Sequence, residues 1–203
     1  MVFYRSGINT HIIFDGLYSA SIGYFDKLLS MHNIKFDSSE CDNEFLEKNP
    51  EIDVVAGQIV SLPKIPSAHD DIAVGLIQYN NLGNANTMYR RKSIEKFNIS
   101  YDNTLIASED WDFWLQILFH GGKFASIPED VLMRRGNSPK YYQAAYEEQN
   151  KTIRERVAMF FLPQNSEQFY SMDGCQKLEQ IASASVQILT PEYLQKLITI
   201  NCR

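Results

Sequence analysis

The sequence has few cysteines, and they are not arranged as a recognisable site. Its three cysteines, Cys41, Cys175 and Cys202, lie far apart in 203 residues, are odd in number and form no C-x-x-C pair. This spacing indicates neither a disulfide framework nor a zinc site. A reducing compartment fits such cysteines best.

Long apolar runs and an excess of positive charge are also missing. No run approaches the roughly 18 apolar residues of a membrane helix, and the first residues lack the basic and apolar regions of a signal peptide. The net charge of −6 and the pI near 5.2 argue against nucleic-acid binding, which depends on Lys and Arg. We therefore expect a soluble, cytoplasmic protein without a transmembrane segment, and leave peripheral attachment to a membrane open.

The composition does provide for a hydrophobic core, because 44% of the residues are hydrophobic and 12% are aromatic. Short apolar runs alternate with helical patterns in the first half, which predicts an α/β layer arrangement. We expect strands at 10–14, 34–36, 52–60 and 86–90, and helices at 19–30 and 41–48. Residues 61–71 contain two prolines and are predicted to form an exposed loop, in which His69 and Asp70 are a weak cation site.

The pattern becomes helical near the C-terminus. We predict helices at 139–161, 173–189 and 191–200, the last with Thr190 as N-cap and Pro191 in its first turn. The sequence thus divides into an α/β domain at 1–138 and a helical C-terminal appendage at 139–203.

One segment between these parts, "SEDWDFWLQILFHGG", has the features of a complete helix. Ser108 can cap it, Gly121 and Gly122 can end it, and its apolar residues follow a helical stripe. That stripe consists of Trp111, Trp114, Leu115, Leu118 and Phe119. We expect two short strands to follow, at 123–127 and 131–134.

The two acidic residues that start this helix have two interpretations. Glu109 and Asp110 can simply complement the positive end of the helix dipole, which is common. Alternatively, a carboxylate fixed beside a cleft can accept a proton from a substrate hydroxyl. Asp112 is not expected to form a metal pair with Asp110, because side chains two residues apart on a helix point about 200° apart.

Three segments taken in order resemble the second half of a family 2 glycosyltransferase of the GT-A fold. They are "NPEIDVVAG", "NANTMYRRKSIEKFNISYD" and "SEDWDFWLQILFHGGKFASIPEDVLMRR". In that family an apolar strand follows Asn-Pro, a threonine-bearing strand ends in arginine, and a Tyr-Asp turn precedes a Glu-Asp helix. The fold that this resemblance implies is a partial or diverged GT-A domain, whose N-terminal nucleotide-binding half is diverged or missing.

The resemblance implies inverting transfer of a sugar from a nucleotide-sugar donor to a glycan or other hydroxyl acceptor. Asp110 would be the general base, and Glu109 would orient the acceptor or hold the loop. The substrate-binding residues would be Thr87, Arg90, Trp111 and Arg134. Arg90 could equally be a structural ion-pair partner.

Family members also hold a divalent metal, Mn²⁺ or Mg²⁺, with an Asp-x-Asp pair at a strand end. In "IKFDSSE" the weak equivalents are Asp37 and Glu40, with Ser39 in place of the second carboxylate. Because this pair is incomplete, the alternative is a truncated or non-catalytic relative that serves as a binding or assembly module.

Overall fold

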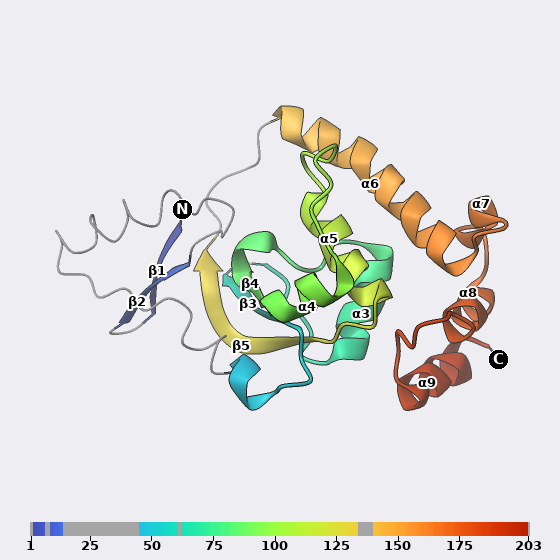
Figure 1. Ribbon diagram of the computed structural model, residues 1–203, viewed down its shortest axis with the longest axis horizontal. Coiled ribbons are helices and arrows are strands. Elements are labelled where there is room, and N and C mark those ends of the chain that lie inside the picture. The colour runs from blue at the N-terminus through green and yellow to red at the C-terminus, as the bar shows by residue number, and fades with distance from the viewer. Residues whose placement is uncertain (1, 7–8, 14–44, 61, 134–139, 203) are drawn as a thin grey trace.

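The computed structural model describes residues 2–6, 9–13, 45–60, 62–133 and 140–202 of the chain (Figure 1). The helix expected at 19–30 and the strand expected at 34–36 lie outside these residues. Of the helix expected at 41–48, residues 45–48 are described and are helical.

A three-stranded mixed sheet forms the centre of the fold. β3 (Val54–Val60) lies in the middle, antiparallel to β4 (Thr87–Tyr89) and parallel to β5 (Phe124–Met133). A separate antiparallel hairpin joins β1 (Val2–Ser6) to β2 (Asn9–Ile13). The α/β fold class is therefore confirmed, together with the strands predicted at 10–14, 52–60 and 86–90, whereas β1 was not predicted.

The prediction of two strands at 123–127 and 131–134 is wrong, because β5 continues through Pro128. Ala56 pairs with Ser126 and Gln58 pairs with Asp130, so β5 carries extra residues at this point of the ladder. Pro128 lies in this irregular stretch of the ladder between β3 and β5. The N–H that proline lacks therefore removes no regular hydrogen bond between the strands.

The two faces of the sheet contribute to two separate hydrophobic clusters, as expected for side chains that alternate along a strand. Val54, Ala56 and Phe124 face the main core, which the helices complete. Val55 and Ile127 face the opposite side and pack with Leu46 from the helical turn at 45–48. The smaller cluster thus covers the face that the main core leaves uncovered.

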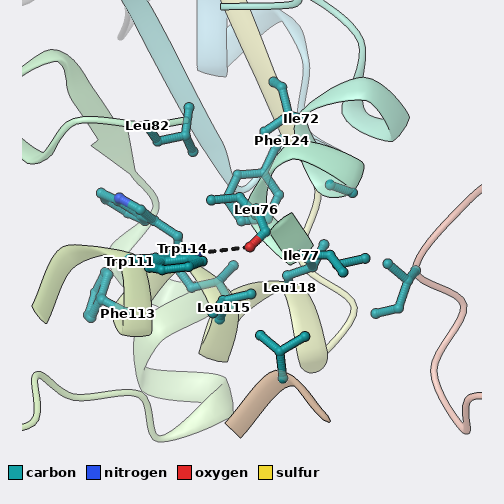
Figure 2. Close-up of a cluster of buried hydrophobic side chains, with 14 of the residues drawn as sticks. Ile72, Leu76, Ile77, Leu82, Trp111, Phe113, Trp114, Leu115, Leu118 and Phe124 are labelled. Atoms are coloured by element: carbon teal, nitrogen blue, oxygen red, sulfur yellow. Dashed lines mark hydrogen bonds between the residues drawn. The ribbon is translucent and has the colours of Figure 1, made fainter. Parts of the chain in front are cut away.

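Three helices contribute most of the main core: α3 (His69–Gln78), α5 (Glu109–Phe119) and α6 (Lys140–Phe161). A further helix, α9 (Pro191–Asn201), packs partly buried residues against this core. Figure 2 shows the centre of this core, where the indole N–H of Trp111 donates to the carbonyl oxygen of Leu76, 2.8 Å away. Since Trp111 is on α5 and Leu76 is on α3, this bond fixes the two helices side by side.

Helix α3 was not predicted, and the exposed loop expected at 61–71 ends at Ala68, three residues earlier. The helical N-cap position is Ala68, whose side chain cannot cap, while Pro63 and Pro66 lie just upstream. Gly75, in the middle of the helix, has a low helix propensity and further weakens the helical pattern of the sequence. It is needed there because an added Cβ would lie 2.0 Å from the side-chain nitrogen of Asn81.

The remaining helices are α4 (Arg91–Phe97), α7 (Ser166–Phe169) and α8 (Gly174–Ala182). The expected helices at 139–161 and 191–200 are confirmed as α6 and α9, but the helix expected at 173–189 stops at Ala182. Asp173 and Gln176 start α8 with a reciprocal capping box. The chain then leaves the helix and buries Ile188 and Leu189 in the main core.

The helical C-terminal segment shares its hydrophobic core with the sheet. Ile153, Val157 and Phe161 of α6 belong to the same cluster as Val54 and Phe124. Figure 1 shows α6 running past α5, with α8 and α9 beyond it beside α3. The boundary drawn at residue 138 therefore marks a change of secondary structure rather than a change of core.

A disulfide bond joins Cys175 at the start of α8 to Cys202 at the end of α9, with their Cα atoms 5.1 Å apart. The expectation that the cysteines form no disulfide is wrong for this pair. The separation of 27 residues did not indicate a disulfide, because the two cysteines meet only after α8 and α9 have folded back on each other. The inference of a reducing compartment rested on unpaired cysteines and loses that basis.

None of the helices in the described segments combines the length and the apolar character needed to cross a bilayer.

Candidate functional site

Helix α5 carries the two acidic residues that the sequence singled out, and its bounds are as predicted. Ser108 occupies the N-cap position but makes no side-chain cap bond, because its hydroxyl donates to Asn150 Oδ1 of α6 at 3.0 Å. The helix ends as expected at two glycines. Gly121 has a φ of 83°, a left-handed conformation that favours glycine, and Gly122 N–H donates to the Ile117 carbonyl oxygen.

Asp110 is held at the start of α5 by two donors that reach the same oxygen. The Trp111 backbone N–H lies 2.8 Å from Asp110 Oδ1, and Asn80 Nδ2 lies 3.1 Å from it. Asn80 belongs to the loop that follows α3. The carboxylate is therefore fixed through Oδ1 from one side by its own helix and from the other by a neutral amide.

Burial raises the pKa of Asp110 to about 6, and the adjacent Glu109 contributes to this rise by charge repulsion. The two hydrogen bonds to Oδ1 act in the opposite direction, since they favour the ionised form. The balance gives a carboxylate that is mostly ionised at neutral pH yet much more basic than an ordinary aspartate.

Glu109 contributes a second buried carboxylate oxygen to this helix start. Its Oε2 is buried and has no hydrogen-bond partner among the described residues. Such atoms are rare in folded proteins and each one calls for an explanation. The start of α5 therefore holds two neighbouring acidic side chains, Glu109 and Asp110. Among the described residues, no cation lies beside either of them.

Asp112 has very different surroundings, although it lies only two residues further along α5. Its Oδ1 lies 2.7 Å from Nη1 of Arg156 on α6, and its Oδ2 accepts a hydrogen bond from Gln116 at 2.8 Å. The other guanidinium nitrogen of Arg156 pairs with Asp102 at 2.6 Å. Asp110 and Asp112 thus point to different partners, which agrees with the expectation that they form no metal pair.

Helix α6 also holds the segment that leads into α5. Gln149 Oε1 accepts hydrogen bonds from the backbone N–H groups of Ile106 and Ala107, both at 3.0 Å. Together with the Ser108–Asn150 bond and the Arg156 ion pairs, this fixes residues 102–112 along one side of α6. The helical C-terminal segment therefore positions the candidate base.

The predicted substrate-binding residues that the structure describes all have partners within the fold. Trp111 is 1% exposed and its indole N–H is bonded to Leu76, so it is a core residue. Arg90 donates from Nε to the Ile52 carbonyl and from Nη2 to those of Leu46 and Asn49. Of the two roles considered for Arg90, the structure shows a structural one, although its partners are carbonyl oxygens rather than an acid.

Thr87 begins β4 and donates its hydroxyl to the Gly83 carbonyl at 2.6 Å. Arg134, the fourth predicted substrate-binding residue, lies outside the described residues. The structure therefore brings Glu109 and Asp110 together, but does not join Thr87 or Arg90 to them by a hydrogen bond.

The metal site expected at Asp37 and Glu40 lies outside the described residues as well. Within the ranges that the structure does describe, no group of three His, Cys, Asp or Glu side chains is placed to hold a metal ion. The metal site at Asp37 and Glu40 therefore stays a prediction from the sequence.

The weak cation site proposed at His69 and Asp70 is instead a structural contact. Asp70 accepts hydrogen bonds from Thr190 N and Oγ1 at 2.7 and 2.6 Å, and Asp71 accepts one from the Tyr193 hydroxyl. His69 Nδ1 accepts from the Phe124 N–H, so its Nε2 donates to the Ile188 carbonyl. Burial, and then the nearby Lys123, lower the pKa of His69.

Sequence reasoning missed Asn80, the side chain from another element that touches Asp110. Its signal was the run "YNNLGNAN" at 79–86, in which four asparagines gather between a helix and a strand. Asparagine side chains often bond nearby backbone groups in turns, so such a run predicts an ordered loop. It does not predict which acid the loop contacts.

No protein-family model matches the sequence, and neither curated proteins nor solved structures give a match.

Proposed function

We propose that this chain is a glycosyltransferase-like protein in which Asp110 is the general base of an inverting sugar transfer. The donor would be a nucleotide sugar and the acceptor a glycan or another hydroxyl compound. The α/β part would then be a partial or diverged GT-A domain with a helical appendage. One observation carries the proposal: a half-buried carboxylate at the start of α5 has its pKa raised to about 6.

A general base works best when its pKa lies near the working pH, because it must be ionised and still accept a proton. Asp110 meets both conditions near pH 7. Its Oδ1 is held by Asn80 and Trp111, so we assign proton transfer to Oδ2. As the acceptor oxygen bonds to the anomeric carbon, its proton passes to Oδ2 and the bond to the nucleoside diphosphate breaks.

The alternative is a non-catalytic relative that acts as a binding or assembly module. A specific observation favours it, since Trp111 and Arg90, two of the expected substrate-binding residues, are both bonded to backbone carbonyls within the fold. The two functions differ in whether a donor sugar is transferred or only a partner is bound.

Calorimetric titration with a panel of nucleotide sugars, with and without Mn²⁺, tests donor binding directly. Transfer and hydrolysis assays then compare the wild type with Asp110→Asn and with Asp71→Asn. Asp71 is an exposed acid in the first turn of α3 and is the matched control. We expect Asp110→Asn to lower the transfer rate by roughly 10²- to 10⁴-fold and Asp71→Asn to leave it unchanged.

Two results would count against the proposal in different ways. Failure of every donor to bind would leave the binding-module alternative. Donor binding with normal transfer by Asp110→Asn would keep the enzyme and remove the base assignment.

A further inference from the structure

We propose that Asn80 is the positioning residue for Asp110, holding its carboxylate by Oδ1 so that Oδ2 is the oxygen that accepts the proton. The inference rests on the proposed role of Asp110 and names a residue that no sequence motif indicated. The contact is direct, with Asn80 Nδ2 lying 3.1 Å from Asp110 Oδ1.

The orientation of the Asn80 amide is set by its own loop. The Leu82 backbone N–H donates to Asn80 Oδ1 at 3.3 Å, a contact that spans two residues as in an Asx turn. With its oxygen occupied by this donor, the amide presents its nitrogen to Asp110. An ionised carboxylate has no hydrogen to give, so this is the orientation it requires.

The loop that carries Asn80 is anchored at three positions that follow it in the chain. Asn81 donates to the Ile72 carbonyl of α3 at 3.1 Å, and Asn86 donates to the Gly57 carbonyl of β3 at 2.6 Å. The Tyr101 hydroxyl donates to Asn84 at 3.2 Å. Asn80 therefore acts from a fixed support, as positioning a catalytic group requires.

The neutrality of Asn80 matters as much as its position. Asp112 on the same helix is paired with a cation, Arg156, whereas Asp110 meets an uncharged amide. An amide donates a hydrogen bond without adding a charge. Asn80 can thus orient Asp110 while leaving it basic enough to take a proton.

The charged groups around Asp110 are few in the described part of the chain. Glu109, its neighbour on α5, raises the pKa of Asp110, whereas α3 and the loop after it face it with the neutral Asn80. Helix α6 directs Arg156 to Asp112 and Asp102 instead. A change in the titration of Asp110 on substitution of Asn80 therefore reports the loss of the amide.

The test follows the side-chain carboxyl carbon of Asp110 by NMR as a function of pH, with the signal assigned through Asp110→Asn. Asn80→Ser removes the amide while its hydroxyl can still accept from Leu82 N–H. Asn80→Asp keeps the turn acceptor but replaces the donor with a negative charge. Asn84→Ser, the same substitution in the same loop, is the matched control because Asn84 contacts Tyr101 instead.

We expect the pKa of Asp110 to rise in Asn80→Ser, to rise further in Asn80→Asp and to stay unchanged in Asn84→Ser. An Asp110 titration in Asn80→Ser that matches the wild type would overturn the proposal. If Asn80→Ser does not fold, Asn80→Ala, which removes the amide without adding a charge, decides in the same way. Because no substrate is needed, failure of donor binding would leave this result standing.

If the wild type does transfer sugar, the pH dependence of kcat gives a second readout. The acidic limb of the profile should move to higher pH in Asn80→Ser and stay in place in Asn84→Ser. A lower kcat with an unmoved limb would mean that Asn80 is merely structural.

Discussion

Helices α3 and α5 start alike but use their acidic residues differently. α3 has Asp70 and Asp71 in its first turn, and α5 has Glu109 and Asp110. In α3 both carboxylates accept hydrogen bonds from the segment at 190–193, so they hold the C-terminal helix in place. In α5 the donors to Asp110 among the described residues are its own helix and one neutral amide.

Asp112 extends the comparison within α5 itself. Its side chain is 7% exposed and is paired with Arg156, so it resembles the acids of α3 more than its neighbour Asp110. The difference lies in what the rest of the fold brings to each acid. Asp70 uses both of its oxygens to bind Thr190 and Asp112 is paired with a cation, whereas both donors to Asp110 reach Oδ1 and neither carries a charge.

The largest effect is expected for Arg156→Met, which leaves Asp112 buried without its cation. Breaking a buried ion pair from one side costs about 3 to 5 kcal/mol, but the Arg156 side chain is 39% exposed. We therefore expect a loss of about 2 to 3 kcal/mol in the free energy of unfolding, measured by urea denaturation. Methionine retains most of the apolar part of the arginine side chain.

The matched control for this change is Arg154→Met, an exposed arginine on the same helix. Its substitution should alter the free energy of unfolding by no more than about 0.5 kcal/mol. Equal effects of the two substitutions would show that Asp112 does not depend on Arg156.

A slightly smaller loss is expected for Asp70→Ala. This change removes the acceptor of two hydrogen bonds from Thr190, each worth about 1.5 to 3 kcal/mol because the acceptor is charged. Thr190 is half-buried, so water can replace part of what is lost, and we expect a cost of about 2 kcal/mol. Asp71→Ala is the comparison, because it removes an acid from the same helix turn that accepts a single bond, from the Tyr193 hydroxyl, at an exposed position. Urea denaturation should show that Asp71→Ala lowers the free energy of unfolding by less than about 1 kcal/mol. Equal losses in Asp70→Ala and Asp71→Ala would show that the two acids contribute equally to stability.

The local features of this fold were predictable because they depend on neighbours in the sequence. The apolar stripe of α5, its double-glycine end and the Thr190-Pro191 start of α9 each depend on residues within a few positions. The acidic start of α5 was found in the same way. The basicity of Asp110 could not be predicted from the sequence, because it depends on burial by other elements.

Several of the missed features depend on contacts between distant residues. Asp70 meets Thr190 across 120 positions, and Asp112 meets Arg156 across 44. The start of α3 has no local helix signal, and the contact of its acids with a segment far along the chain could not be read from the sequence. The paired cysteines and the carbonyl contacts of Arg90 were hidden for the same reason.

The smallest expected effect, and the one of opposite sign, belongs to Asp110→Asn. A carboxyl whose pKa is raised from 3.8 to about 6 destabilises the folded state at pH above that range, because the unfolded chain ionises more easily. This penalty is absent well below pH 3.8 and complete above about pH 7. Asparagine removes it and can still accept from Asn80 and Trp111, so we expect a gain of about 1 to 2 kcal/mol at about pH 7.5.

The decisive measurement is the pH dependence of this gain, obtained from urea denaturation at about pH 4 and about pH 7.5. The gain should nearly vanish at the lower pH, whereas Asp112→Asn on the same helix should be destabilising at the higher pH because it weakens the pair with Arg156. A loss of stability in Asp110→Asn at the higher pH would place Asp110 with the structural acids of α3. A gain would mean that the chain keeps an acid there at a cost to its stability, as is common at functional sites.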